Sequence, residues 1–165
     1  EADLIVKVAN ADINAATSPG AVLRHLSEIY PFIELPDLIV ADPGQLTGPG
    51  VVYINAGARA GILGQPIPVR AGPELLAALG TMTVTVRDAE GKELDRAQGS
   101  AILGHPLNAV LWLIADLRRD GLRLNKGDLI SLGSFSRPLP IKAGAGATVA
   151  YDGLPGNPTV SVRFP

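Results

Sequence analysis

Three carboxylates near the start of the chain have the types and spacing of metal ligands. Glu1 and Asp3 are two residues apart at the start of an apolar run, so on a β-strand their side chains would share one face. Glu34 is set in the apolar stretch 31–36, where a carboxylate must reach solvent or be paired. Neighbouring carboxylates repel unless a proton or cation lies between them. If the three converge, they form a hard oxygen site suited to Mg²⁺ or Mn²⁺.

The same three residues also have a simpler interpretation. Carboxylates close to a chain terminus are usually solvated and frayed, which would apply to Glu1 and Asp3. Glu34 could cap a turn. Spacing alone leaves the metal site and the solvated carboxylates as open alternatives.

Other polar side chains could act on a substrate. His105 precedes the proline of a predicted helix and could donate a proton or stabilise a carboxylate, or it could hydrogen-bond the backbone. Ser134, in the loop 133–137, is a second candidate catalytic residue that could line a substrate or only stabilise a turn. Arg137 could hold a substrate carboxylate or lie exposed in solvent. The spacing of serine, histidine and aspartate supports no catalytic triad.

The composition limits the class of protein. The chain has 165 residues, 47% of them hydrophobic and 18% charged, which favours a single domain spanning residues 1–165. A formal net charge of −2 gives no basic patch, so neither nucleic acid nor a membrane surface is an expected partner. Without cysteine, thiolate zinc sites and disulfides are excluded. No apolar run approaches the roughly 20 residues of a transmembrane helix.

Short apolar runs must position these side chains. The runs are punctuated by 19 glycines and 14 prolines, which predicts many strands joined by tight turns. Clean alternation over 81–88 predicts a half-buried antiparallel strand, which returns over 92–98 after a turn at Glu90-Gly91. Further strands are predicted at about residues 3–9, 51–54, 129–132, 138–141, 148–151 and 159–164.

Helical patterns are fewer. The principal helix is predicted from Pro106 to a cap at Gly121, with apolar residues at helical spacing between them. Ser18-Pro19 predicts a second helix running to about Tyr30, where Pro31 would end it. A short helix is predicted at 73–79. We therefore predict a mixed α+β fold, mainly antiparallel β, with one principal helix.

Several blocks, in order, resemble one enzyme family. Glu1-Ala-Asp3 followed by Ile33-Glu34-Leu-Pro-Asp37 resembles the Glu-x-Glu and later Glu of the 2-oxopent-4-enoate hydratases, with Asp3 where that family usually has its second Glu. Residues 99–113 resemble the family's turn into its main helix, and residues 126–134 resemble its strand leading to the active-site rim. Asn55-Ala-Gly-Ala58 resembles a segment that lies near the substrate.

This resemblance implies a fold and a reaction. The fold would be the β-roll or sandwich of the fumarylacetoacetate hydrolase C-terminal domain. Mg²⁺ or Mn²⁺ would chelate a 2-hydroxy-2,4-dienoate and stabilise its dienolate, and water would add to give a 4-hydroxy-2-oxo acid. The expected enzyme is thus a hydro-lyase of aromatic compound catabolism, with Asn55 at its substrate. Relatives use the same arrangement for decarboxylation or C–C bond hydrolysis.

The resemblance also implies what this chain lacks by itself. Family members usually have a substantial segment before the Glu-x-Glu strand, which supplies a lysine. Nothing in this chain corresponds to it, so we expect metal binding without complete chemistry, or a non-catalytic metal-binding remnant.

Assembly and location are expectations of the same kind. We expect a homo-oligomer, because relatives assemble and the strand edges of a short apolar chain need cover. Trp112 is expected in core or interface packing. The resemblance implies a cytoplasmic location; a periplasmic or secreted protein is the alternative because the first residue is not methionine.

Overall fold

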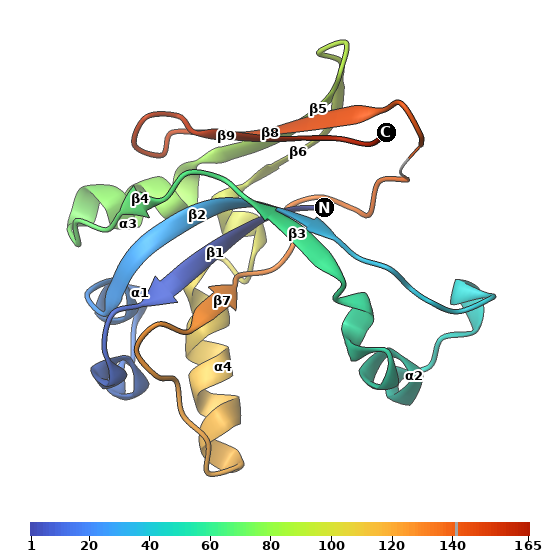
Figure 1. Cartoon of the computed structure of the whole chain (residues 1–165). Helices are drawn as coiled ribbons and strands as arrows, with labels where there is room; N and C mark the ends of the chain where they lie inside the picture. Colours follow the sequence, from blue (N-terminus) through green and yellow to red (C-terminus); the bar gives the residue numbers. More distant parts are fainter. Residues whose placement is uncertain (141) are drawn as a thin grey trace.

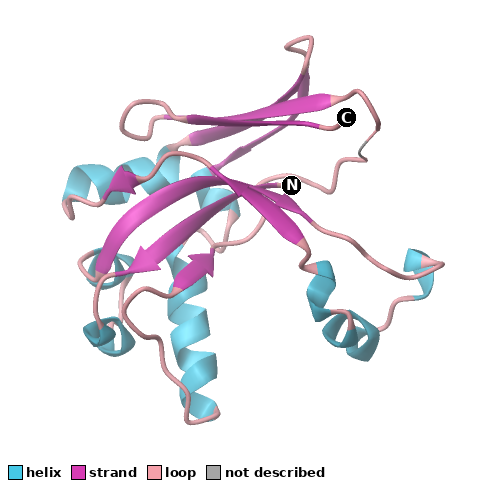
Figure 2. Cartoon of the chain, in the orientation of Figure 1, coloured by secondary structure: helices cyan, strands magenta, loops and turns pink. Residues whose placement is uncertain are grey.

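Two antiparallel β-sheets form the framework of the computed structural model, which describes residues 1–140 and 142–165 (Figures 1 and 2). Sheet A has the strand order β3-β2-β1-β7, and β4 also pairs with β2. Its strands are β1 (Ala2–Val8), β2 (Leu26–Leu35), β3 (Ala60–Leu63), β4 (Ile67–Pro68) and β7 (Leu129–Ser131). Sheet B has the order β6-β5-β8-β9. Its strands are β5 (Thr83–Asp88), β6 (Glu93–Gln98), β8 (Gly146–Asp152) and β9 (Thr159–Arg163).

Helices are short except for one. The α-helices are α1 (Pro19–Leu23), α2 (Gly48–Tyr53), α3 (Pro73–Thr81) and α4 (Leu107–Arg119). Single 3₁₀ turns are η1 (Ala11–Ala15), η2 (Pro43–Gln45), η3 (Asn55–Gly57) and η4 (Gly99–Ala101). The prediction of a mixed fold, mainly antiparallel β, with one principal helix is confirmed. Within the described residues, no helix is both long enough and apolar enough to cross a membrane.

The end of α4 follows the sequence prediction closely. Gly121 adopts a left-handed backbone with φ of +70°. The Leu122 amide donates to the Leu117 carbonyl at 2.8 Å, and the Gly121 amide donates to the Arg118 carbonyl at 3.2 Å. These two bonds form a Schellman motif, in which glycine carries no steric cost.

One continuous core joins the two sheets and the helices. Alternate residues of β1 and β5 enter it, including Leu4, Val6, Val84 and Val86, each at most 3% exposed. Tyr151 of β8 is fully buried, and its hydroxyl accepts from the Phe32 amide at 3.2 Å and donates to the Asp3 carbonyl oxygen. Sheet B is thereby anchored to the two strands that carry the candidate metal ligands.

The predicted helix from Pro19 to Tyr30 is wrong beyond its first turns. Helix α1 ends at Leu23, and β2 begins at Leu26. The register of β1 and β2 shifts by one residue opposite Lys7 and Val8, which leaves Ser27 as an extra residue. This bulge turns both Leu26 and Ile29 toward the core, so two inward residues three apart imitate helical spacing.

Pro31 lies inside β2 rather than ending a helix. On one side of β2, β4 pairs with residues 28 and 29 and β3 pairs with residues 32–35. Pro31 falls between these two partners, where its missing N–H removes no ladder hydrogen bond. A proline is therefore tolerated in a strand that is paired on both sides.

Two predicted strands differ from the structure. Residues 51–54 form the end of α2 and the residue after it; the helix is capped by Thr47, whose hydroxyl accepts from the Gly50 amide at 3.4 Å. Residues 138–140 are not strand, and residue 141 lies outside the described residues. The strands predicted near 3–9, 81–88, 92–98, 129–132, 148–151 and 159–164 are confirmed, as is the helix at 73–79.

Candidate metal and substrate site

The pairing of β1 with β2 brings the three predicted ligands to one face of sheet A. The Glu34 amide donates to the Glu1 carbonyl at 2.9 Å, and the Glu1 nitrogen donates to the Glu34 carbonyl at 2.9 Å. Asp3 lies opposite Phe32 in the same ladder. Directly opposed residues share a face, as do residues two apart in a strand. Glu1, Asp3 and Glu34 therefore project from the same face.

Asp3 is a carboxylate without access to solvent. Its side chain accepts hydrogen bonds from the Ser131 hydroxyl and the Leu4 amide. Burial raises the pKa of Asp3 to about 7; the two hydrogen bonds oppose this shift, and the charge of Glu34 adds to it. A buried carboxyl group with this pKa is close to half protonated at neutral pH.

The charge of Glu1 acts on Glu34 across the strand pair. Partial burial raises the pKa of Glu34, and the negative charge of Glu1 raises it further. The Glu1 carboxylate accepts a hydrogen bond from the Ser134 hydroxyl. Ser134, predicted as a candidate catalytic residue, therefore contacts a candidate ligand.

Three serines run alongside the beginning of β1. Besides Ser134, Ser131 binds the Asp3 carboxylate, and the Ser136 hydroxyl oxygen accepts from the Ala2 amide at 2.9 Å. Sequence analysis missed Ser131 and Ser136. Their spacing with Ser134 was visible, but only the pairing of β7 with β1 places them beside the carboxylates.

The donor chemistry suits a hard divalent cation, although the side chains do not converge on one centre. Among residues 1–140 and 142–165, no three His, Asp or Glu side chains are gathered into a preformed ligand set. Serine hydroxyls hold two of the three carboxylates instead. The raised pKa values of Asp3 and Glu34 record burial and mutual repulsion, both of which a cation would relieve. The residues present therefore fit a divalent metal ion.

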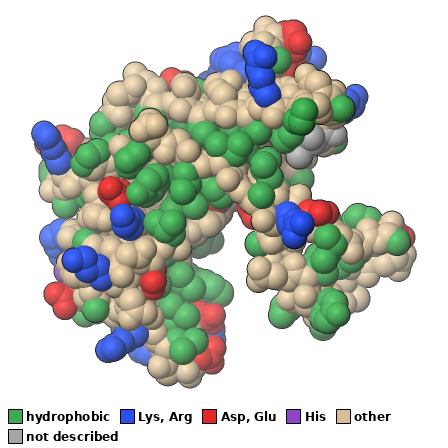
Figure 3. Space-filling model, viewed as in Figure 1, with side chains coloured by type: hydrophobic (Ala, Val, Ile, Leu, Met, Phe, Trp, Pro, Cys, Tyr) green, Lys and Arg blue, Asp and Glu red, His purple; other side chains and the backbone are tan. Residues whose placement is uncertain are grey.

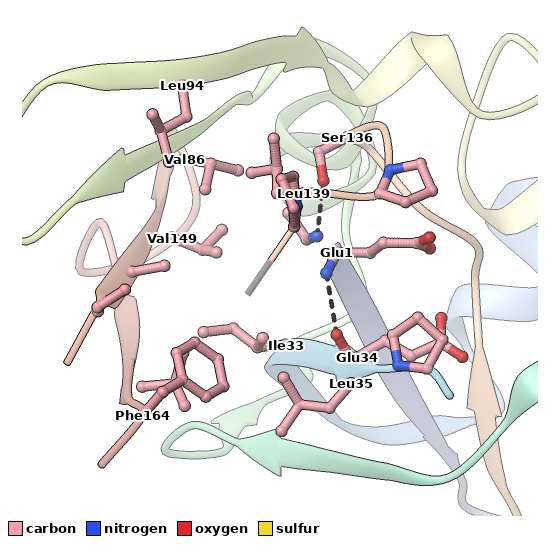
Figure 4. A pocket seen from close by; sticks show the side chains of 18 of the residues that line it. Glu1, Ile33, Glu34, Leu35, Val86, Leu94, Ser136, Leu139, Val149 and Phe164 are labelled. Atoms are coloured by element: carbon pink, nitrogen blue, oxygen red, sulfur yellow. Dashed lines mark hydrogen bonds between the residues drawn. The ribbon is translucent and has the colours of Figure 1, made fainter. Parts of the chain in front are cut away.

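A cavity of about 380 Å³ lies between the two sheets, and Ala2 and Ile33 line it from the core face of sheet A (Figure 4). Glu1 and Glu34 line one side of it, and their carboxylates point away from the apolar wall. The opposite wall includes Val86, Val149 and Phe164. Such a volume is in the range of small-molecule sites.

Comparisons with known proteins relate part of the chain to hydratases. No family model matches the chain. It is 33% identical over 90 residues to the 2-keto-4-pentenoate hydratase of Paraburkholderia phymatum, covering 48% of this chain and 34% of that protein. It is 32% identical over 109 residues to the 2-oxo-hept-4-ene-1,7-dioate hydratase of Escherichia coli, covering 65% and 38%. The matches thus cover about a third of these curated relatives.

Solved structures match over the whole chain. The 4-oxalocrotonate decarboxylase of Pseudomonas putida G7, complexed with magnesium and adipate, superposes with a TM-score of 0.84 at 25% identity, covering 100% of this chain and 59% of that one. A fumarylacetoacetate hydrolase family protein of Yersinia pestis superposes with a TM-score of 0.65 at 14% identity, which shows the fold alone. Over part of its length the chain is similar to hydratases such as 2-keto-4-pentenoate hydratase. It has the fumarylacetoacetate hydrolase fold.

His105 bonds backbone groups and does not line the cavity. Its Nδ1 accepts from the Leu107 amide at 3.2 Å, so Nε2 carries the proton and donates to the Leu76 carbonyl at 3.0 Å. The ring thus joins α3 to the start of α4. These contacts match the alternative of backbone hydrogen bonding, and His105 has no role in the mechanism proposed below.

The two predicted substrate-binding residues, Asn55 and Arg137, also lie outside the lining of the cavity. The Arg137 amide donates to the Asp95 carboxylate at 3.1 Å, and its Nε lies 3.8 Å from the same carboxylate. Its side chain is 73% exposed. Asn55 is exposed after α2, with a left-handed φ of +52°. Substrate binding by Asn55 and Arg137 stays a prediction.

Proposed function

We propose that this chain carries the metal-binding face of a hydratase-type lyase. The proposed substrate is a 2-hydroxy-2,4-dienoate, to which water adds to give a 4-hydroxy-2-oxo acid. Glu1, Asp3 and Glu34 would hold Mg²⁺ or Mn²⁺. The observation that carries the proposal is the placement of three carboxylates on one face of sheet A, two with raised pKa values. The hydratases among the relatives support the reaction type.

The residues of the chain have distinct tasks in this proposal. When bound, a divalent cation would supply Lewis acidity that polarises the C2 oxygen of the substrate and stabilises dienolate charge. Ser131 and Ser134 orient the carboxylates of Asp3 and Glu1 by hydrogen bonding.

Decarboxylation is the second candidate. The similarity to 4-oxalocrotonate decarboxylase covers the whole chain, and a 33% identical match links it to the decarboxylase of Pseudomonas sp. strain CF600. A decarboxylase and a hydratase would release different products from the same kind of enolate. A non-catalytic metal-binding protein is the remaining alternative.

Parallel assays separate these functions. With added Mg²⁺ or Mn²⁺, hydration consumes the ultraviolet absorbance of 2-hydroxypenta-2,4-dienoate, whereas decarboxylation releases CO₂ from 4-oxalocrotonate. Both assays should be run on this chain and on forms extended upstream of Glu1. We expect metal-dependent hydration by at least one form, with this chain alone weaker or inactive.

A matched pair of variants tests the carboxylates themselves. Glu34→Gln should abolish metal-dependent hydration, because it removes one candidate ligand. Glu90→Gln changes an exposed carboxylate in the β5–β6 turn and should leave the rate unchanged. Hydration that persists in Glu34→Gln or in a chelator would overturn the proposal. CO₂ release without hydration would favour the decarboxylase.

A further inference from the structure

The cavity between the sheets lies on the core face of sheet A, opposite the face of the three candidate metal ligands. Ala2 and Ile33 line it from β1 and β2, and both belong to the core. These two residues alternate with Glu1, Asp3 and Glu34 along the strands, so their side chains point to the other face. The proposed metal site therefore does not use this cavity.

Among the described residues, the polar groups that border the cavity already have partners within the chain. The Glu1 ammonium group donates to the Glu34 carbonyl at 2.9 Å. The Ser136 hydroxyl oxygen accepts from the Ala2 amide at 2.9 Å. The Asp88 carboxylate accepts from two amides of the β5–β6 turn. The carboxylates of Glu1 and Glu34 point away from the apolar wall (Figure 4). A polar ligand would therefore find few free partners in this cavity.

The rest of the lining is apolar and comes from both sheets. Its large side chains are Ile33, Leu35, Leu38, Val86, Leu94, Leu139, Val149, Val162 and Phe164 (Figure 4). They surround about 380 Å³, a volume in the range of small-molecule sites. Left empty, such a space gives its lining atoms no contacts, and water inside it would lack hydrogen-bond partners. An apolar occupant would remove both costs.

We propose that this cavity is a second binding site, which takes an uncharged apolar molecule of about the size of a bicyclic aromatic hydrocarbon. Its affinity comes from the burial of apolar surface and requires no metal. Anions are disfavoured, because the carboxylates of Glu1, Glu34 and Asp88 outnumber the one ammonium group at the border. The site goes beyond the proposed function and does not depend on it.

Fluorescence titration with naphthalene tests the site. In a chelator, the metal-free chain should bind it saturably, at one site per chain, with a Kd of about 100 µM or tighter. The matched anion 1-naphthoate should bind about fivefold or more weakly. Absence of saturable naphthalene binding, or equal or tighter binding of 1-naphthoate, would overturn the inference. Neither outcome depends on the metal site.

A pair of matched substitutions in β8 locates the ligand. Ala147 lines the cavity, and Ala147→Leu should weaken naphthalene binding about tenfold by filling the space. Ala150 lies three residues along the same strand and so on its opposite face, and Ala150→Leu should leave the affinity unchanged. Equal effects of both substitutions would contradict a site in this cavity.

Thermal unfolding separates a filled cavity from a misfolded chain. The added methylenes of Ala147→Leu occupy empty space, so its Tm without ligand should equal or exceed that of the wild type. Naphthalene should raise the Tm of the wild type and of Ala150→Leu, but not that of Ala147→Leu. Ala145→Leu, which fills the same cavity from the loop before β8, is a second filling variant. Undiminished affinity in both filling variants would place the ligand elsewhere and refute the proposal.

Discussion

At the scale of single residues, Asp3 links the sequence pattern to the chemistry of the site. It is 0% exposed, and its burial raises its pKa to about 7 from 3.8. A folded-state pKa above the unfolded value means that the native chain binds an extra proton between these two pH values. The stability due to this proton is full below pH 3.8 and is lost as the pH rises through about 7.

This linkage predicts the stability of the metal-free protein. Between pH 5 and pH 8 its free energy of unfolding should fall, and Asp3→Asn should remove most of that fall. At pH 8 the variant should be more stable than the wild type by on the order of 2 kcal/mol. Urea denaturation in a chelator measures both. Asp12→Asn, at an exposed position, is the control. An unchanged pH dependence in Asp3→Asn would contradict the assignment.

Metal binding should displace protons from the same residues. Because the pKa values of Asp3 and Glu34 are raised, Mn²⁺ binding near pH 6.5 should release protons into solution. Titrations in two buffers of different ionisation enthalpy would report the number released. Glu34→Ala should lower the affinity for Mn²⁺ about tenfold to hundredfold, since a ligand is lost. Equal affinity in both proteins would remove Glu34 from the site.

At the scale of elements, the site depends on how β8 holds β1 and β2. The buried Tyr151 hydroxyl connects the backbone of Asp3 with that of Phe32. Burial raises the pKa of this hydroxyl, which keeps it protonated and able to donate. The hydroxyl thus holds β1 and β2 together at Asp3 and Phe32. The residues adjacent to these two in sequence, Ala2 and Ile33, line the cavity.

Tyr151→Phe should therefore destabilise the fold beyond the loss of one hydroxyl group. It leaves the partly buried Phe32 amide and the buried Asp3 carbonyl without this partner, at a cost of about 1–3 kcal/mol. Tyr30→Phe is a matched control, because the Tyr30 hydroxyl bonds the Glu28 carboxylate at 2.7 Å in a half-exposed setting. Denaturant unfolding should show the larger loss in Tyr151→Phe. Similar losses of unfolding free energy in the two variants would mean that the buried Tyr151 hydroxyl stabilises the fold no more than the half-exposed Tyr30 hydroxyl does.

At the scale of the whole molecule, segment 36–59 projects away from both sheets as an arm (Figure 1). Apolar side chains cover much of its visible surface in Figure 3. Val52 and Tyr53 of α2 are 79% and 91% exposed, and Ile39 is 70% exposed. Trp112 on α4, expected in core or interface packing, is 62% exposed, which contradicts core packing. Exposed apolar surface of this kind is typical of a contact surface.

The homo-oligomer stays a prediction, and this arm is the contact surface that we propose for it. We propose that α2 contacts another copy of the chain, so Val52→Glu should raise the dissociation constant about tenfold or more by burying a charge in the contact. Sedimentation equilibrium at micromolar concentration measures it. Glu74→Gln, an exposed change on α3, is the control. A wild-type monomer would refute the proposal.

Much of this molecule follows from local sequence patterns. Alternation predicted β5 and β6, because each strand has one face in the core, and apolar spacing with Gly121 predicted α4 and its end. The two-residue spacing of Glu1 and Asp3 placed both side chains on one face, because that geometry belongs to any strand. The apolar setting of Glu34 marked it as a third candidate ligand, and the resemblance supported it. The β1–β2 ladder shows that Glu34 shares the face of Glu1 and Asp3.

Tertiary structure decided what depends on partners distant in the chain. The bulge at Ser27 arises only when β2 pairs with β1. Because of it, Leu26 and Ile29 both face the core, and their three-residue spacing resembled that of a helix. Ser131 bonds Asp3 because β7 pairs with β1, although the two residues are more than a hundred positions apart in sequence. His105 bonds the backbone of α3 and none of the three carboxylates. The cavity exists only between two packed sheets. Periodicity records how a segment meets its surroundings, but which segments meet is determined by the packing of the whole chain.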